Sequence, residues 1–186
     1  PRGLDAVGGF DRFKAWFRLR KLAYGPEARE FGLPLPKGVL AVGLPGTGKS
    51  LMAKSIAADL QVPLLRLDLG GQQEKWVGAS QQNIRAALAT IDAIGPCVVI
   101  LDEIEKSLVG ATQGAADGGV AADQFGTLLS WMQERKGGAF VFATAFYTAG
   151  RSMGLKAIDT IVAALLMGST AAGLFWPIPI TLSVDA

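Results

Sequence analysis

The 186-residue sequence contains no histidine and a single cysteine, Cys97. Without histidine, the chain has no imidazole general base, no Ser-His-Asp triad and no histidine metal ligand. One cysteine excludes an intramolecular disulfide and a zinc site built from several thiolates. Because Cys97 opens an apolar run, we expect it to be a small core residue rather than a nucleophile. Carboxylates, lysines, hydroxyls and backbone groups remain for any chemistry.

The charge of the chain is nearly balanced, with 18 lysines and arginines against 16 acidic residues, a formal net charge of +2. This excess is too small to indicate a nucleic-acid partner. Half of the residues are hydrophobic, which is enough for the core of one domain. Residues 1–5 carry no apolar signal-peptide segment and are typical of an excised piece of a longer chain. A reducing, cytoplasmic location is the expectation.

A glycine-rich loop follows the first apolar run of the chain. Residues 38–42 predict a buried parallel strand, and residues 51–60 predict a helix with one apolar face. The motif between them is that of a phosphate-binding loop, with the sequence Gly43, Leu44, Pro45, Gly46, Thr47, Gly48, Lys49 and Ser50. Its glycines allow successive N–H groups to point inward and hold β- and γ-phosphates at a helix N-terminus. Residues 43–51, ending at Leu51, are therefore the predicted nucleotide-binding segment.

Lys49 and Ser50 are the two side chains of this loop with predicted chemical roles. Lys49 is expected to place a catalytic charge on the β- and γ-phosphate oxygens, and the Ser50 hydroxyl is expected to bind the metal. An ordinary glycine turn is the alternative, because the chain holds 24 glycines. The strand and helix on either side favour the phosphate-binding interpretation.

Two adjacent carboxylates follow a second apolar run at residues 98–101. Asp102 is predicted to hold Mg²⁺ through water, because this ion gives up its hydration shell reluctantly. Glu103 is predicted to polarise the attacking water as a catalytic base. A solvated acidic turn is the alternative, but the phosphate-binding loop upstream favours a site for a nucleoside triphosphate and Mg²⁺. Glu103 is the residue that distinguishes a hydrolase from a nucleotide-binding protein.

The other segments predict an α/β fold in which strands and helices alternate. Further strands are expected at residues 63–69 and 139–144, and helices at 10–24, 84–94 and around 125–132, with a glycine-alanine loop at 110–119. The basic helix at 10–24 is expected to pack on the domain rather than to bind a membrane or nucleic acid. This order predicts a parallel sheet with helices on both faces over residues 1–146, and a nucleotide at the carboxyl ends of its strands.

From about residue 4 to residue 145 the chain resembles the AAA+ ATPases of the classic clade, particularly the small AAA proteins of cyanobacteria and plastid genomes. The resemblance is carried by the phosphate-binding loop, by residues 98–106 and by Leu4-Asp5-Ala6-Val7-Gly8-Gly9. It implies a P-loop NTPase fold, truncated here and without a helical lid, with ATP and Mg²⁺ as ligands and a protein-remodelling activity. It also implies adenine contacts near Val7 and Gly8, for which a plain loop entering a helix is the alternative.

The same resemblance implies a pore loop at Trp76, Val77 and Gly78, which in the family projects into a hexameric ring and grips a polypeptide substrate. An exposed tryptophan offers a large surface that tolerates many sequences, and a glycine lets a loop swing. A half-buried tryptophan is the alternative interpretation. Self-assembly into a ring is expected only if the native chain is complete.

The resemblance fails at the end of the last strand. In the family an asparagine that orients the attacking water follows shortly after an alanine-threonine pair, whereas Phe146 stands here after Ala143, Thr144 and Ala145. Arg151 is the only arginine in residues 147–186 and lacks the motif that surrounds the family's arginine finger. Since such a finger contributes about 10³- to 10⁵-fold in rate, the sequence predicts impaired hydrolysis. A nucleotide-binding module that does not hydrolyse ATP is the alternative.

Residues 147–186 form an atypical apolar tail, in which residues 160–182 carry no charge. The tail could be a packed helix followed by an edge strand, because prolines restrict a strand to a sheet edge. It is also long enough for a membrane segment, which needs about 20 apolar residues and would tether an interaction protein. A third interpretation is foreign sequence joined by accident.

Overall fold

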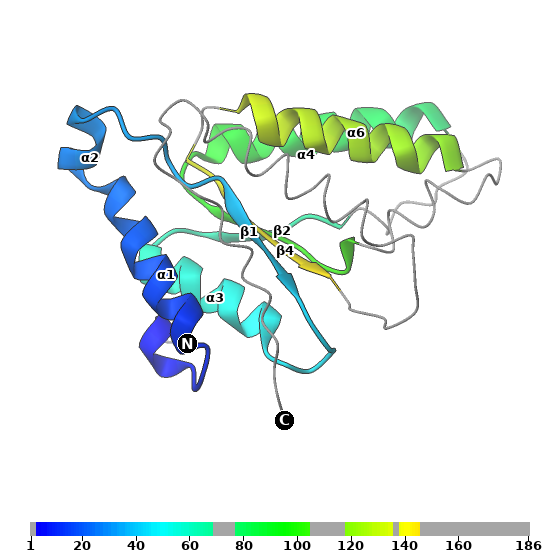
Figure 1. The fold of residues 1–186 in the computed structure, drawn as a ribbon. Helices are drawn as coiled ribbons and strands as arrows, with labels where there is room; N and C mark the ends of the chain where they lie inside the picture. Colours follow the sequence, from blue (N-terminus) through cyan, green and yellow to red (C-terminus); the bar gives the residue numbers. More distant parts are fainter. Residues whose placement is uncertain (1–2, 69–76, 105–117, 136–137, 146–186) are drawn as a thin grey trace.

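The computed structural model describes residues 3–68, 77–104, 118–135 and 138–145 (Figure 1). The described strands form one four-stranded parallel sheet in the order β1-β4-β3-β2. Their bounds are Gly38–Val42 for β1, Leu64–Arg66 for β2, Val98–Leu101 for β3 and Phe140–Ala145 for β4. The last of the described strands, β4, therefore lies between β1 and β3.

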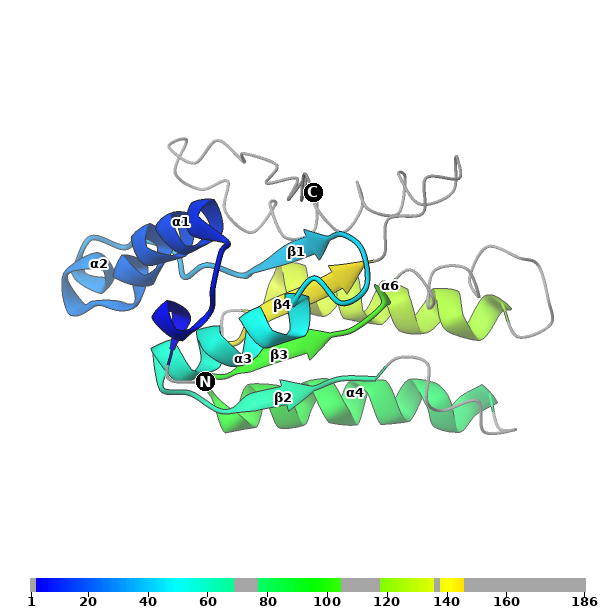
Figure 2. The same cartoon turned by 90° about the horizontal axis from the view of Figure 1, so that it is seen from below.

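Helices cover both faces of this sheet (Figures 1 and 2). Helices α1 and α3 lie on one face, and α4 and α6 lie on the other. The described helices are α1 (Asp11–Lys21), α2 (Pro26–Glu30), α3 (Lys49–Leu60), α4 (Val77–Ile94) and α6 (Gly118–Glu134), with 3₁₀ turns η1 (Leu4–Ala6) and η2 (Leu22–Tyr24). The α/β prediction with helices on both faces is confirmed.

The inner strand β3 is apolar along its whole length, and β4 is apolar apart from Thr144, because both faces of these strands are buried. On β3, Val99 and Leu101 pack against α4 and α6. Val98 and Ile100, the alternate residues, pack against α1 and α3. Cys97, directly before this strand, is 1 % exposed and is a core residue, as predicted. An uninterrupted apolar run followed by two carboxylates thus marks the point at which a buried strand reaches the sheet edge.

Two predicted boundaries are wrong. Strand β2 ends at Arg66 instead of residue 69, although the Leu67 N–H still donates to the Ile100 carbonyl. Helix α6 begins at Gly118, inside the expected loop 110–119, although glycine is a poor helix former. One apolar residue of the predicted helix 84–94 is also less buried than its periodicity indicates: Ile94, at the end of α4, is 45 % exposed.

The basic helix α1 packs on the sheet through aromatic side chains. Phe13 and Phe17 are 2 % and 0 % exposed. Their rings meet Phe142 and Phe140 edge to face, with centroids 6.3 and 5.7 Å apart. Lys21 forms an ion pair with the Asp59 carboxylate of α3 at 2.8 Å. These contacts confirm the interpretation of α1 as a surface helix of the domain.

Arg135 links two strands at the amino-terminal edge of the sheet. Its buried guanidinium donates hydrogen bonds to the carbonyls of Lys37 and Ala139, the residues that precede β1 and β4. It also lies over the Trp131 ring, 4.6 Å from the ring centroid. The Trp131 indole N–H donates to Asp92 of α4 at 2.9 Å. Burial lowers the pKa of Arg135 to about 10. One side chain thus joins two strands to the helices on one face.

No helix within the described ranges is both long enough and apolar enough to cross a bilayer. The tail at 147–186, with its three interpretations, lies outside the described residues.

Candidate nucleotide site

The phosphate-binding loop connects β1 to α3 at the carboxyl edge of the sheet (Figure 2). Gly46 and Gly48 have φ angles of 80° and 86°, which side chains other than glycine rarely adopt. The Thr47 hydroxyl donates to the Leu44 carbonyl at 2.9 Å and closes the turn. Lys49 is the first residue of α3. The first N–H groups of a helix have no partner within it, so this end is suited to an anion.

The Lys49 ammonium lies folded over the loop that precedes it. Its Nζ donates to the carbonyls of Gly43 and Leu44 at 2.8 and 2.6 Å. Leu44, Pro45 and Gly46 are exposed, so the loop is open to solvent. These two contacts hold the positive charge over the phosphate-binding loop. A lysine ammonium has three donors, so it can also bond to a phosphate oxygen of a ligand in the loop.

The acidic turn begins where β3 ends. Glu103 has a φ of 53°, an uncommon conformation for a residue with a side chain. Its backbone N–H donates to the Thr144 hydroxyl at 3.1 Å. The same hydroxyl donates to Asp102 Oδ1 at 2.5 Å. Thr144 is 2 % exposed, so a buried hydroxyl of the central strand fixes both predicted site residues.

Strand β4 brings the loop and the acidic turn together. It pairs with β1 on one side and with β3 on the other. Ala145, next to Thr144, accepts a hydrogen bond from the Gly43 N–H at 3.2 Å. Two consecutive residues of one strand are thus bonded to the start of the phosphate-binding loop and to Asp102. Both motifs lie at the same edge of the sheet, as the sequence predicts.

Arg66 also lies at this edge, although no motif in the sequence points to it. It is the last residue of β2, and its Nη2 lies 3.6 Å from Asp102 Oδ2. Arg66 pairs in register with Ile100, whose side chain packs on the α1 and α3 face. Since side chains two residues apart share a face, Asp102 emerges on that same face, where α3 begins.

The N-terminal segment passes close to the phosphate-binding loop. The Val7 side chain is 4 % exposed in the core, and its carbonyl accepts a hydrogen bond from Lys14. Gly8 is exposed. The Phe10 ring lies close to Gly48, 3.6 Å from the position that a Cβ would take there. Adenine contacts in this segment remain a prediction. Gly8 is accessible for them, whereas the Val7 side chain is packed in the core.

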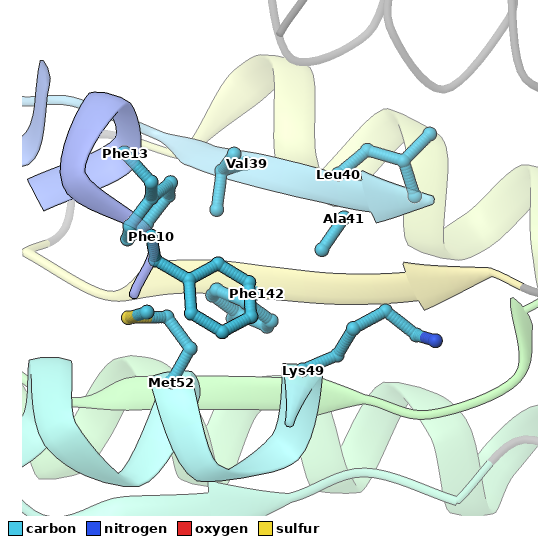
Figure 3. A pocket seen from close by; sticks show the side chains of 8 residues that line it. All are labelled: Phe10, Phe13, Val39, Leu40, Ala41, Lys49, Met52 and Phe142. Atoms are coloured by element: carbon cyan, nitrogen blue, oxygen red, sulfur yellow. The ribbon is translucent and has the colours of Figure 1, made fainter. Parts of the chain in front are cut away.

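Phe10 closes a small apolar hollow between β1 and α3 (Figure 3). The hollow is lined by Phe10, Phe13, Val39, Leu40, Ala41, Lys49, Met52 and Phe142. Its free space is about 10 Å³, enough for one water molecule at most. The Lys49 ammonium points away from it in Figure 3. The hollow is therefore a packing gap beneath the loop, too small for a purine base.

The residues predicted for the metal fit Mg²⁺ chemically. Asp102 supplies a carboxylate, and Ser50, the second residue of α3, supplies a hydroxyl oxygen. Mg²⁺ prefers oxygen ligands and is often held by one or two carboxylates together with substrate phosphates. No group of three or more acidic or cysteine side chains surrounds a potential metal position in the described part of the chain. The two predicted protein ligands, Ser50 and Asp102, are enough for a Mg²⁺ ion whose other ligands are phosphate oxygens and water.

The remaining predicted site residues are only partly described. Val77 and Gly78 form the start of α4, and Trp76 lies outside the described residues, so the pore loop remains a prediction. Phe146 and Arg151 also lie outside them.

Replacing Thr144 with valine should destabilise the protein by about 2 kcal/mol, because the hydrogen bond to the Asp102 carboxylate and the one from the Glu103 N–H are both lost. Valine keeps the shape of threonine, so little packing is lost. Urea unfolding measures the change. Thr144→Ser keeps the hydroxyl and should retain most of the stability; equal losses in both variants would contradict the role of the hydrogen bonds.

Comparison with known proteins shows the family to which the chain is similar. Residues 39–155 match the ATPase family associated with various cellular activities (AAA). The chain is 41 % identical over 142 residues to the uncharacterised AAA domain-containing protein ycf46 of Guillardia theta, and 42 % identical over 140 residues to that of Pyropia yezoensis. These alignments cover 76 % and 75 % of the chain but only 28 % of each relative.

A second group of relatives is more distant. The chain is 36 % identical over 135 residues to the chloroplastic ATP-dependent zinc metalloprotease FTSH 6 of Oryza sativa subsp. japonica. That alignment covers 72 % of the chain and 19 % of the relative. The shared part is thus a small portion of each longer protein.

Proposed function

Because the chain belongs to the AAA family of ATPases, we propose that its carboxyl sheet edge binds ATP with Mg²⁺ and carries the chemistry of ATP hydrolysis. The observation that supports this most directly is the end of β4. Thr144 is bonded to Asp102, and Ala145 is bonded to Gly43, so the phosphate-binding loop and the acidic turn form one site.

We assign one role to each residue of the proposed site. Lys49 turns its ammonium from the loop carbonyls to the β- and γ-phosphate oxygens. Ser50 and Asp102 hold the hydrated metal, and bound Mg²⁺ supplies positive charge to the phosphates. Glu103 is exposed on the turn beside Asp102, where its carboxylate can accept a proton from water. The exposed Gly8 and its neighbours contact adenine.

A slow or absent hydrolysis step is part of the proposal. Phe146 cannot hydrogen-bond to the attacking water, and Arg151 lacks an arginine-finger motif. A second candidate function is therefore a nucleotide-binding module without turnover. The wider activity would be protein remodelling, with a ring of subunits and a polypeptide substrate gripped at Trp76, Val77 and Gly78.

The test compares ATP binding with phosphate release in the same preparation. Glu103→Gln should keep the ATP affinity within about twofold and lower turnover about 100-fold, because general-base catalysis contributes at least that much. Glu134→Gln, at the end of α6, removes an exposed carboxylate as a control and should change neither quantity. Unchanged turnover in Glu103→Gln would overturn the assigned base. Tight ATP binding by the parent chain without any phosphate release would favour the second candidate.

A further inference from the structure

The Asp102 carboxylate has two different partners. Its Oδ1 accepts the hydrogen bond from the buried Thr144 hydroxyl, and its Oδ2 faces the Arg66 guanidinium at 3.6 Å. The Asp102 side chain is 27 % exposed, whereas that of Arg66 is 70 % exposed. The contact with Thr144 is therefore fixed inside the sheet, whereas another cation from solvent can replace Arg66 at Oδ2.

The Arg66 contact adds little to the stability of the fold. An ion pair with an exposed partner gains modest energy in water and loses side-chain freedom. At 3.6 Å the two groups attract each other without a short hydrogen bond. The position of Arg66 is nevertheless set by the sheet, because β2 ends at this residue and pairs with β3 through Ile100. A cation is thus held beside the carboxylate that the proposed function assigns to Mg²⁺.

We propose that Arg66 is a positioning residue that competes with Mg²⁺ for Asp102, so that its ion pair must be displaced when Mg²⁺ and ATP bind. This inference rests on the proposed function and concerns the regulation of the same site. Oδ2 is the oxygen that a hydrated Mg²⁺ would reach most readily once Arg66 moves, because Oδ1 already accepts the Thr144 hydroxyl. Two cations compete for one oxygen, so the pair raises the Mg²⁺ concentration that the site requires.

The test is the Mg²⁺ dependence of ATP binding, measured by titrating the full chain with a fluorescent ATP analogue at a series of Mg²⁺ concentrations. Arg66→Gln should lower the Mg²⁺ concentration for half-maximal binding about two- to fivefold, the range that exposed ion pairs cover. The difference should shrink as KCl is raised, since salt screens exposed charges. Arg66→Lys keeps a charge at this position and should lie nearer to the parent chain.

Two further measurements separate this role from others. In EDTA, Arg66→Gln should bind ATP as weakly as the parent chain, because Arg66 acts through Asp102 and not through phosphate. Arg85→Gln, on the exposed surface of α4, removes an arginine elsewhere and should leave the Mg²⁺ requirement unchanged.

An unchanged or higher Mg²⁺ requirement in Arg66→Gln would overturn the proposal, and so would a loss of metal-free ATP affinity, which would place Arg66 on the phosphates. If the parent chain binds no ATP at any Mg²⁺ concentration, the proposed function itself fails. Normal Mg²⁺-dependent binding in the parent, with no response to Arg66→Gln, would remove only the competition between Arg66 and the metal. Circular dichroism of each variant establishes that the fold is retained.

Discussion

Replacing Lys49 with alanine should weaken ATP binding about 100-fold, because each hydrogen bond to a charged group contributes about 1.5–3 kcal/mol and tenfold in affinity corresponds to about 1.4 kcal/mol. The ammonium lies at the loop, where its present acceptors are the carbonyls of Gly43 and Leu44. No other side chain is placed to supply that charge within the loop sequence, since Lys49 is its only basic residue. Isothermal titration with ATP in the presence of Mg²⁺ measures the change.

Lys54→Ala is the matched control for this experiment. Lys54 lies on the same helix α3 and is exposed. Its removal changes the net charge of the chain by the same amount but leaves the loop intact, so ATP affinity should stay within about twofold because salt screens an exposed charge. Undiminished ATP binding in Lys49→Ala would show that the loop does not hold the phosphates.

Replacing Arg135 with methionine should lower the free energy of unfolding by about 3 kcal/mol. Two charge-assisted hydrogen bonds and a cation–π contact are lost, and the cost of burying the guanidinium, which offsets part of this loss, is removed. Methionine fills much of the same volume, so the effect reports the polar contacts. The carbonyls of Lys37 and Ala139 each lose a hydrogen-bond donor, so this side chain no longer joins the starts of β1 and β4. Urea denaturation at neutral pH measures the loss.

Arg20→Met provides the comparison for Arg135→Met. The Arg20 guanidinium also lies over a tryptophan, 5.4 Å from the centroid of the Trp16 ring, but on the partly exposed side of α1. Loss of a partly exposed cation–π contact should cost about 1 kcal/mol. If Arg20→Met loses as much stability as Arg135→Met, the larger effect predicted for Arg135 is wrong.

Local sequence patterns predicted the phosphate-binding loop and two of the strands because each depends on neighbouring residues. Strands β1 and β3 match the predicted ranges, since a short apolar run between polar or glycine-rich segments is typical of a strand in a parallel sheet. The loop needs glycines at fixed spacing, and Gly46 and Gly48 adopt the positive φ angles that this spacing requires. These features can be read without knowledge of the fold.

Contacts between strands could not be read in the same way. Arg66 meets Asp102 only because β2 lies beside β3, and the sequence pattern does not specify which strands are neighbours. Thr144 was identified within a family motif, but its bonds to Asp102 and to the Glu103 N–H depend on β4 lying at the centre. Phe10 adopts a φ of 59°, which nothing in its local sequence indicates. The side chains that position the site are thus products of topology.

The central place of β4 also bears on how the chain is made. Gly38 of β1 pairs with Val141, and Val98 of β3 pairs with Phe140. Strands β1 and β3 therefore cannot form these pairs until β4 has been synthesised. Until residues 140–145 leave the ribosome, the nascent chain carries two hydrophobic strands with unpaired inner edges, a state prone to mispairing with other chains. A chain truncated before Phe140 would keep these strand edges unpaired, and we expect chaperones to bind it.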